Sequence, residues 1–429
     1  MKRKLFFPAV LALVLAFVKH APAQNSTDIY EFSCPNVYSG HTIVRHLSSG
    51  NEFVAYHIHG TTPYFAYTNV ATNVAYEFDL SAGLRVFDFS ILGNTVYFCG
   101  NDSINAIIGK FDCSVFFSTS GHIEYAKFPT IENFFRIETY TDPGSGLPSV
   151  AALGYDMTTS GLTPTRAVYL LRDNGLALTG YYRSISIGNN TDIFTDIAVT
   201  KNYIVAVGVY SYSPPQAFMG WVDKANTAMA NYDFPNDPDL NTGYLVCALK
   251  DDDIAVANTV YDNTSHVFYN RIHTYDISTQ TELNSQDIAL PDKSAPDDLL
   301  YLDGDNSLLM MQFTAGVPLV LYIDPYSSNY VVDHFHYSGF SYEYNLDRIS
   351  PTRFLVSGPT SSHTHAFVTR SKTAGNTSNC LVYDNLKAVQ SVPMQLNPVQ
   401  NQLSISNVGF TPVSIFPQTI SINNSCTEP

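Results

Sequence analysis

The sequence predicts an all-β fold in which almost every element is a short antiparallel strand. Tyr and Phe are abundant, with 29 and 27 residues in the 429-residue chain, and aromatic side chains favour strands. Asn, Asp, Gly, Ser or Pro interrupts the apolar runs about every 8 to 12 residues, the spacing of many short strands. Long stretches with the apolar spacing of an amphipathic helix are absent from the sequence.

The strands form a repeat in which an apolar strand, a polar turn and a stronger apolar strand follow one another. Two of the clearer copies begin at Asp88 and Asp196. The turns between the two strands are marked by Asn51, Asn94, Pro148, Asn202, Asp252, Asn306 and Thr352. Consecutive markers are 43 to 54 residues apart, which leaves room for two further strands in every copy.

A four-stranded unit of this length, repeated seven times, resembles the β-propeller architecture. One small twisted sheet cannot cover its two apolar faces, whereas radial stacking in a ring covers both. We therefore expect a seven-bladed β-propeller of four-stranded antiparallel blades over residues 24–385, with a short C-terminal extension over residues 386–429. Two stacked sandwich domains are the alternative. Neither the Gly-His and Trp-Asp signature of WD40 repeats nor the kelch double glycine occurs, so no specific family is indicated.

Acidic residues recur at the turns of this repeat. Four of them follow apolar pairs at the ends of predicted third strands: Asp112, Asp223, Asp276 and Asp324. Two further groups fall in turns between first and second strands, at Asp251–Asp253 and Asp303–Asp305. A carboxylate at such a position accepts hydrogen bonds from backbone amides nearby, so turn formation explains these residues.

The first 23 residues have the features of a secretory signal peptide. Lys2, Arg3 and Lys4 precede an apolar run, and Ala21-Pro22-Ala23 provides small residues where a signal peptidase cleaves. The apolar run of about 14 residues is shorter than the roughly 20 that a membrane-spanning helix requires. We expect a secreted protein, either extracellular or located in the periplasm or at the cell surface, with no membrane span.

The charge of the chain limits its partners. The formal net charge is −16, and removal of the four basic residues in the predicted signal segment leaves −20. A field of this sign repels nucleic acid and anionic membrane surfaces. Six cysteines remain, and a secreted compartment permits disulfides, although the pairing cannot be chosen from the sequence.

The last residues have a different composition and are interrupted by proline. The segment that begins Asn397-Pro-Val-Gln-Asn-Gln-Leu-Ser-Ile-Ser resembles the opening of the C-terminal secretion-sorting domain of Bacteroidetes. The final basic strand of that domain is missing here. We therefore expect a tail that packs across the side or base of the propeller, with a sorting domain as the alternative.

Three His-x-His pairs are the candidate metal ligands. They are His57 with His59, His334 with His336, and His363 with His365. Residues i and i+2 of a strand point to the same side, so each pair could present two imidazoles together. The expected strand register places all three pairs toward one face in adjoining blades. Imidazoles with an open coordination position bind transition metals, although decoration of a polar surface is the favoured explanation of the pairs.

Two functions fit these residues. The first is a binding module that recognises a protein or a glycan through loops on one face. Its candidate residues are Tyr210, Tyr212, Tyr261, Asp262, Tyr337 and Tyr342. Tyrosine offers apolar area and a hydroxyl at small entropic cost, which suits a binding surface. The second is an extracellular hydrolase or lyase, either metal-dependent or at the channel mouth. No compact catalytic motif is found, so binding is favoured, no cofactor is predicted beyond the candidate metal, and enzymatic activity stays open.

Overall fold

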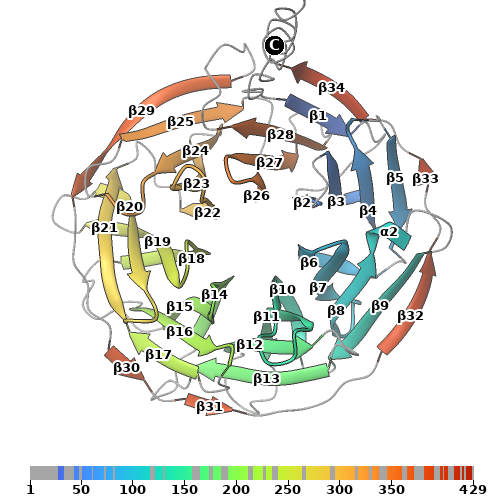
Figure 1. The fold of residues 1–429 in the computed structure, drawn as a ribbon, viewed down its shortest axis with the longest axis horizontal. Coiled ribbons are helices and arrows are strands. Elements are labelled where there is room, and N and C mark those ends of the chain that lie inside the picture. Colours follow the sequence, from blue (N-terminus) through green and yellow to red (C-terminus); the bar gives the residue numbers. More distant parts are fainter. Residues whose placement is uncertain are drawn as a thin grey trace, which may run out of the picture.

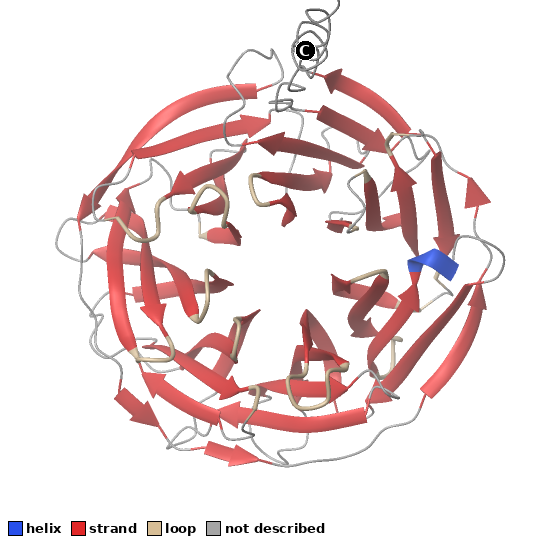
Figure 2. Cartoon of the chain, viewed as in Figure 1, coloured by secondary structure: helices blue, strands red, loops and turns tan. Residues whose placement is uncertain are grey.

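The computed structural model is a ring of small β-sheets around a central axis (Figure 1). The only helix in the described part of the chain is the single turn α2 (Cys113–Val115), and strands form nearly everything else (Figure 2). The structure describes residues 28–32, 43–47, 51–59, 61–71, 74–80, 83–115, 121–128, 131–156, 165–172, 177–184, 192–210, 216–225, 229–233, 240–262, 267–289, 295–314, 317–327, 331–337, 345–359, 365–371, 381–390, 397–399, 401–403, 410–415, 418–419 and 422–427. The predicted signal segment, residues 1–23, lies outside this description.

Each blade is a meander of four antiparallel strands. The innermost strands are β2 (Ile43–His46), β6 (Arg85–Leu92), β10 (Ile131–Thr141), β14 (Asp192–Val199), β18 (Leu240–Ala248), β22 (Pro296–Leu302) and β26 (Asn345–Ser350). The second strands are β3 (Glu52–His59), β7 (Thr95–Asn101), β11 (Pro148–Asp156), β15 (Tyr203–Tyr210), β19 (Asp253–Asp262), β23 (Ser307–Thr314) and β27 (Arg353–Pro359). The third strands are β4 (Thr62–Asn69), β8 (Ala106–Asp112), β12 (Thr165–Arg172), β16 (Gln216–Asp223), β20 (Val267–Asp276), β24 (Val317–Ile323) and β28 (His365–Ser371). The fourth are β5 (Val74–Asp79), β9 (Gly121–Phe128), β13 (Ala177–Ser184), β17 (Met229–Asp233), β21 (Thr281–Ala289), β25 (Val331–Tyr337) and β1 (Asp28–Phe32).

The predicted β-propeller is therefore confirmed. Among the described residues, five sheets each contain one of these meanders, and a nine-stranded sheet contains two more, which agrees with the expected number of blades. Every second strand begins at or directly after the turn marker predicted for it. Asn51, for example, precedes β3, and Asn306 precedes β23 with a left-handed φ of 49°.

The first strand of the chain closes the ring. Strand β1 pairs with β28 from the far end of the sequence, in a register that places Ile29 opposite Val368. This blade therefore contains strands from both ends of the described chain, which links its first and last parts by backbone hydrogen bonds.

A further set of strands lies around the outside of the ring (Figure 1). These outer strands are β29 (Leu381–Gln390), β30 (Asn397–Val399), β31 (Asn401–Leu403), β32 (Phe410–Ile415), β33 (Gln418–Thr419) and β34 (Ile422–Thr427). Strand β29 lies between β21 and β25 and so joins two blades, while the others pair in turn with β17, β13, β9, β5 and β1. The expected domain boundary after residue 385 falls within β29.

The hydrophobic core lies between neighbouring blades, as the burial argument predicted. Phe65 on β4 is fully buried, and its ring centroid lies 5.5 Å from that of Phe89 on β6 in the next blade. Phe128 on β9 and Phe134 on β10 meet in the same way, with centroids 5.1 Å apart. Edge-to-face contacts of this kind add to the stabilisation from area burial. Each blade therefore covers the apolar face of its neighbour.

The turn interpretation is confirmed for the four acidic residues that end third strands. The backbone amides of Ser114, Ala225, Ser278 and Tyr326 donate to Asp112, Asp223, Asp276 and Asp324 respectively, over 2.8 to 2.9 Å. Asp252 accepts bonds from the hydroxyl of Thr200 and from the backbone and side-chain nitrogens of Asn202, both in the preceding blade. This turn therefore also holds two blades together.

Among the described residues, Cys99, Cys113 and Cys247 are free thiols. No helix in this part of the chain has the length and apolar character to cross a bilayer.

Candidate functional site

The strand directions define two faces of the ring. At one face, here called the 2–3 face, second strands end and third strands begin, as at His59 and Thr62. At the other, the 1–2 face, first strands lead into second strands, as at Leu92 and Thr95. Inner strands of adjacent blades run parallel, since Asp88 and Ser90 face Ile137 and Thr139 in the same order. The same face of every blade therefore lies on the same side of the molecule.

The candidate binding residues that the structure describes lie at the 2–3 face. Tyr210 ends β15, Tyr261 and Asp262 end β19, and Tyr337 ends β25, in three consecutive blades. The side chain of Tyr261 is half-buried. Tyr212 and Tyr342 lie outside the described residues. Strand topology thus brings four of the six positions to one rim of the ring.

The histidine pairs lie on the strands that the sequence predicted. His57 and His59 end β3, His334 and His336 lie near the end of β25, and His365 begins β28. His363 lies outside the described residues. The ring of His57 is fully buried and stacks on Tyr64, with centroids 5.8 Å apart. Within the described residues no group of three or more His, Cys, Asp or Glu side chains could hold a metal, so the metal site stays a prediction.

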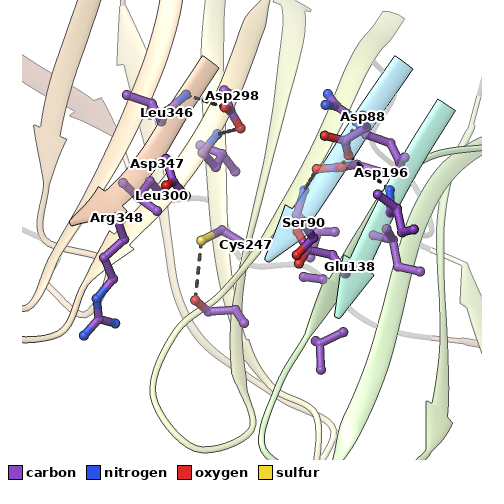
Figure 3. A pocket seen from close by; sticks show the side chains of 18 of the residues that line it. Asp88, Ser90, Glu138, Asp196, Cys247, Asp298, Leu300, Leu346, Asp347 and Arg348 are labelled. Carbon is purple, nitrogen blue, oxygen red and sulfur yellow. Dashed lines mark hydrogen bonds and ion pairs between the residues drawn. The ribbon is translucent and has the colours of Figure 1, made fainter. Parts of the chain in front are cut away.

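A second candidate site, which the sequence did not predict, is a cavity at the centre of the ring (Figure 3). Its volume is about 400 Å³, within the usual range for small-ligand sites. Every innermost strand contributes to its wall, and the charged residues among the lining are Arg45, Asp88, Arg136, Glu138, Asp196, Asp298, Asp347 and Arg348.

Four of these carboxylates, those of Asp88, Asp196, Asp298 and Asp347, support the inner edges of the blades. Asp88 accepts the amide of Phe89 through Oδ1 over 2.9 Å, and that of Ile137 in the next blade through Oδ2 over 3.1 Å. Asp298 acts in the same way on Leu299, at 2.9 Å, and on Leu346 in the next blade, at 2.7 Å. An unpaired amide at a strand edge needs an acceptor, and each carboxylate provides one for two amides.

The same pattern continues around the ring. Asp196 accepts the amides of Ile197 and of Val246 in the next blade, the latter over 2.9 Å. The amide of Val44 donates to Ser357 Oγ over 3.2 Å and to Asn345 Oδ1 over 3.4 Å. Asp347 of the seventh blade acts similarly, because it accepts the amides of Arg348 and of His46 in the next blade.

Arg45 performs the complementary task for backbone carbonyls. Its Nη1 donates to the carbonyl of Leu346 over 2.8 Å, and its Nε donates to that of Phe89 over 3.2 Å. Its guanidinium also lies 3.3 Å from Asp88 and 3.6 Å from Asp347. Burial alone would lower the pKa of Arg45, but these carboxylates raise it above its ordinary value, so Arg45 stays charged.

The second arginine of the cavity pairs with one carboxylate. Arg136 Nε lies 3.5 Å from Asp196 Oδ1. The loss of surrounding water raises the pKa of Asp196 to about 6, although Arg136 and the amide of Val246 oppose this shift. The pKa of Asp347 is raised to about 6 for the same reason, against the opposing charge of Arg45.

Glu138 has no such partner among the described residues. It lines the cavity from β10, and no hydrogen bond or ion pair within the described part of the chain engages its carboxylate. The loss of water raises its pKa to about 8, against the charge of Arg45 and with the help of Asp88, Asp196 and Asp347. Near neutral pH, Glu138 therefore takes up and releases protons.

Cys247 is the remaining reactive side chain of the cavity. Burial first, and then the charges of Asp298, Asp196 and Glu138, raise the pKa of its thiol well above the ordinary value. The thiol donates to the carbonyl of Ala248 over 3.4 Å. A protonated thiol is a poor nucleophile, so this arrangement does not favour covalent catalysis.

The sequence contained a signal for this cavity. A carboxylate stands inside two mostly apolar innermost strands, at Asp88 on β6 and at Asp196 on β14. A carboxylate at the edge of a buried strand needs a structural or functional partner. Which carboxylates meet depends on the blade-to-blade register, which spacing alone does not determine.

Comparisons with known proteins concern the ring architecture. No family model and no curated relative matches the chain. Among solved structures, the Dos1 propeller is 10% identical with a TM-score of 0.48, covering 81% of this chain and 95% of its own. The β-propeller domain of Cps50 (Swd1) from Myceliophteria thermophila is also 10% identical with a TM-score of 0.48, covering 80% of this chain and 100% of its own. An ulvan lyase of polysaccharide lyase family PL25, bound to -[GlcA(1-4)Rha3S]-, is 8% identical with a TM-score of 0.47, covering 78% and 94%. At these values the likeness carries no ligand or activity over to this chain, which stands as a β-propeller of no specific family.

Proposed function

We propose that this protein is a secreted binding module that recognises a protein or a glycan through the 2–3 face of its propeller. The observation that carries the proposal is the convergence of strand ends. Tyr210, Tyr261 and Tyr337 come from three consecutive blades and end their strands at the same rim. Tyrosine offers flat apolar area for a sugar ring or an apolar side chain, and a hydroxyl for hydrogen bonds.

The structural use of Asp88 and Asp298 in the cavity supports binding over hydrolysis. Catalysis by two carboxylates needs side chains free to exchange protons with a substrate. In Asp88 and Asp298, both carboxylate oxygens instead accept hydrogen bonds from backbone amides. A metal-dependent hydrolase or lyase on the same face is the alternative, and the buried ring of His57 gives it little support.

The test is a binding screen on the full secreted chain. A glycan array and a panel of extracellular proteins separate the two ligand classes. Tyr261→Phe removes one hydroxyl at the 2–3 face, and Tyr203→Phe removes one at the opposite end of a second strand. We expect Tyr261→Phe to weaken binding about tenfold and Tyr203→Phe to leave it unchanged. Equal effects of both changes would contradict the proposed face.

Secretion needs its own measurement. The proposal predicts that the protein leaves the cell and begins at Gln24 after cleavage behind Ala23. N-terminal sequencing of the exported protein measures this directly. A mature chain that retains Met1 inside the cell would contradict the expected compartment.

A further inference from the structure

The cavity contains more hydrogen-bond acceptors than donors. In an antiparallel strand, the N–H and C=O of one residue point to the same side. The amides of Phe89, Ile137, Val246, Leu299 and Leu346 point away from their own sheets, because inner-edge side chains accept them. The carbonyls of these residues therefore face the centre of the ring as well.

Among the described residues, side-chain donors reach these carbonyls on one side of the cavity. Arg45 donates to Phe89 and Leu346, which lie in the two blades on either side of its own. Among the described residues, no side chain donates to the carbonyls of Ile137, Val246 or Leu299, which line the same cavity. The opposite side of the cavity is thus rich in acceptors that no side chain in the described part of the chain pairs.

Glu138, next to Ile137 on β10, adds a negative charge to the same cavity. The amides around the ring account for Asp88, Asp196 and Asp298, and Arg45 lies against Asp347. The fold makes no comparable use of the carboxylate of Glu138. A charged group is costly in a confined cavity, and a cationic partner offsets that cost.

We propose that the central cavity binds a small organic ammonium ion, which pairs with Glu138 and donates to the carbonyls of Ile137, Val246 and Leu299. The bound ammonium does on this side what the guanidinium of Arg45 does on the other. An ammonium group has three donors and no acceptor, so it matches a site of carboxylate and carbonyl oxygens. This site lies in the channel and is independent of the proposed 2–3 binding face.

The charge state of Glu138 makes the proposed binding depend on pH. Its pKa in the empty cavity is about 8, under the influence of Arg45, Asp88, Asp196 and Asp347. The carboxylate must be ionised to pair with the ligand, whose ammonium stays protonated like that of lysine, with a pKa of about 10.4. We expect the affinity to rise about tenfold per pH unit from pH 6 and to level off above pH 8.

The experiment is calorimetric titration of the full chain with putrescine and ethanolamine in phosphate buffer free of other amines. We expect dissociation constants between micromolar and millimolar, about one proton released per ligand at pH 7, and at least a tenfold loss in Glu138→Gln. Ethylene glycol and glycolate, which lack the cation, should not bind. Glu138→Asp, which keeps the charge, should retain part of the affinity.

A matched control removes a carboxylate far from the cavity. Glu124 pairs with Lys110 at 3.6 Å and is half exposed, so Glu124→Gln should bind both amines like the parent. Thermal unfolding of each variant shows whether it is folded. The proposal is overturned if neither amine binds, if Glu138→Gln binds them equally well, or if calcium binds instead and depends on Glu138.

Discussion

Asp88 on β6 accepts a 3.1 Å hydrogen bond through Oδ2 from the backbone amide of Ile137 on β10, the innermost strand of the next blade. The other oxygen of the same carboxylate accepts the amide of Phe89 on its own strand. Asp196, Asp298 and Asp347 repeat this arrangement in other blades. Innermost strands would otherwise expose unpaired amides, so the acids link the blades at the centre of the ring.

Replacement of Asp88 tests this structural role. Asp88→Ala leaves the amides of Phe89 and Ile137 without acceptors and removes a carboxylate beside Arg45. We expect a loss of about 2 to 4 kcal/mol in the free energy of unfolding, measured by urea denaturation. Asp112→Ala, at an exposed turn with one backbone bond, should cost about 1 kcal/mol or less. Equal losses in the two variants would contradict the role of Asp88.

Glu138 should make the stability of the protein depend on pH. Its pKa of about 8 in the folded state is above the value of about 4.3 for an unfolded glutamate, so the folded chain binds more protons between these values. Stability therefore falls as the pH rises from about 5 to 8. Glu138→Gln removes this contribution, and its stability relative to the parent should increase over the same range by up to about 4 kcal/mol.

Urea denaturation of both proteins at pH 5 and pH 8 provides the measurement. Asp196 and Asp347, with pKa values raised to about 6, remain in both proteins and cancel in the comparison. If the difference between variant and parent is the same at the two pH values, the carboxylate of Glu138 is not perturbed as described.

Gly100 should not tolerate a side chain. It lies on β7 opposite the β-bulge of β6, and an added Cβ would overlap the backbone carbonyl of Arg85. We expect Gly100→Ala to lower the free energy of unfolding by about 2 to 3 kcal/mol, because a backbone atom cannot move aside easily. At Gly144, in an exposed turn, an added Cβ lies 3.7 Å from the nearest other atom, so Gly144→Ala serves as the control. Similar melting temperatures for the two variants would contradict this packing.

The histidine pairs make a prediction about metal content. A binding module needs no transition metal, and the buried ring of His57 leaves little access for one. We expect elemental analysis of the purified protein to find no stoichiometric transition metal. One metal per chain, lost in a His59→Ala, His365→Ala double variant, would instead favour the metal-dependent enzyme.

Much of the blade architecture could be predicted because local chemistry marks it. Asn94 and Asn202 stand immediately before second strands, and Asp276 accepts the amide of its turn, since these residues form turns by local hydrogen bonds. Ring closure by β1 could not be predicted, because Asp28–Phe32 is too short to show where it pairs. The outer strands could not be predicted either, because the prolines of that segment obscure its strand pattern.

The two candidate sites differ in how much the sequence predicts of them. The face of Tyr210, Tyr261 and Tyr337 follows from strand direction, which an alternating meander determines. The partners of Glu138 and Asp88 do not, because they depend on how innermost strands of different blades align. Alignment between blades is a matter of tertiary packing and leaves only a weak trace in the sequence.

The positions of the blades, the cavity and the 2–3 face all depend on a closed ring. A designed disulfide between β1 and β28, where the ring closes, tests this most directly. Ile29 on β1 lies opposite Val368 on β28, and directly opposed residues on paired strands are close enough to be joined. We predict that Ile29→Cys combined with Val368→Cys forms a crosslink under mild oxidation, seen by peptide mass spectrometry, with a raised melting temperature. If these two cysteines fail to join, or join no better than Ile29→Cys combined with a cysteine in place of Val168 in another blade, the closed ring is wrong.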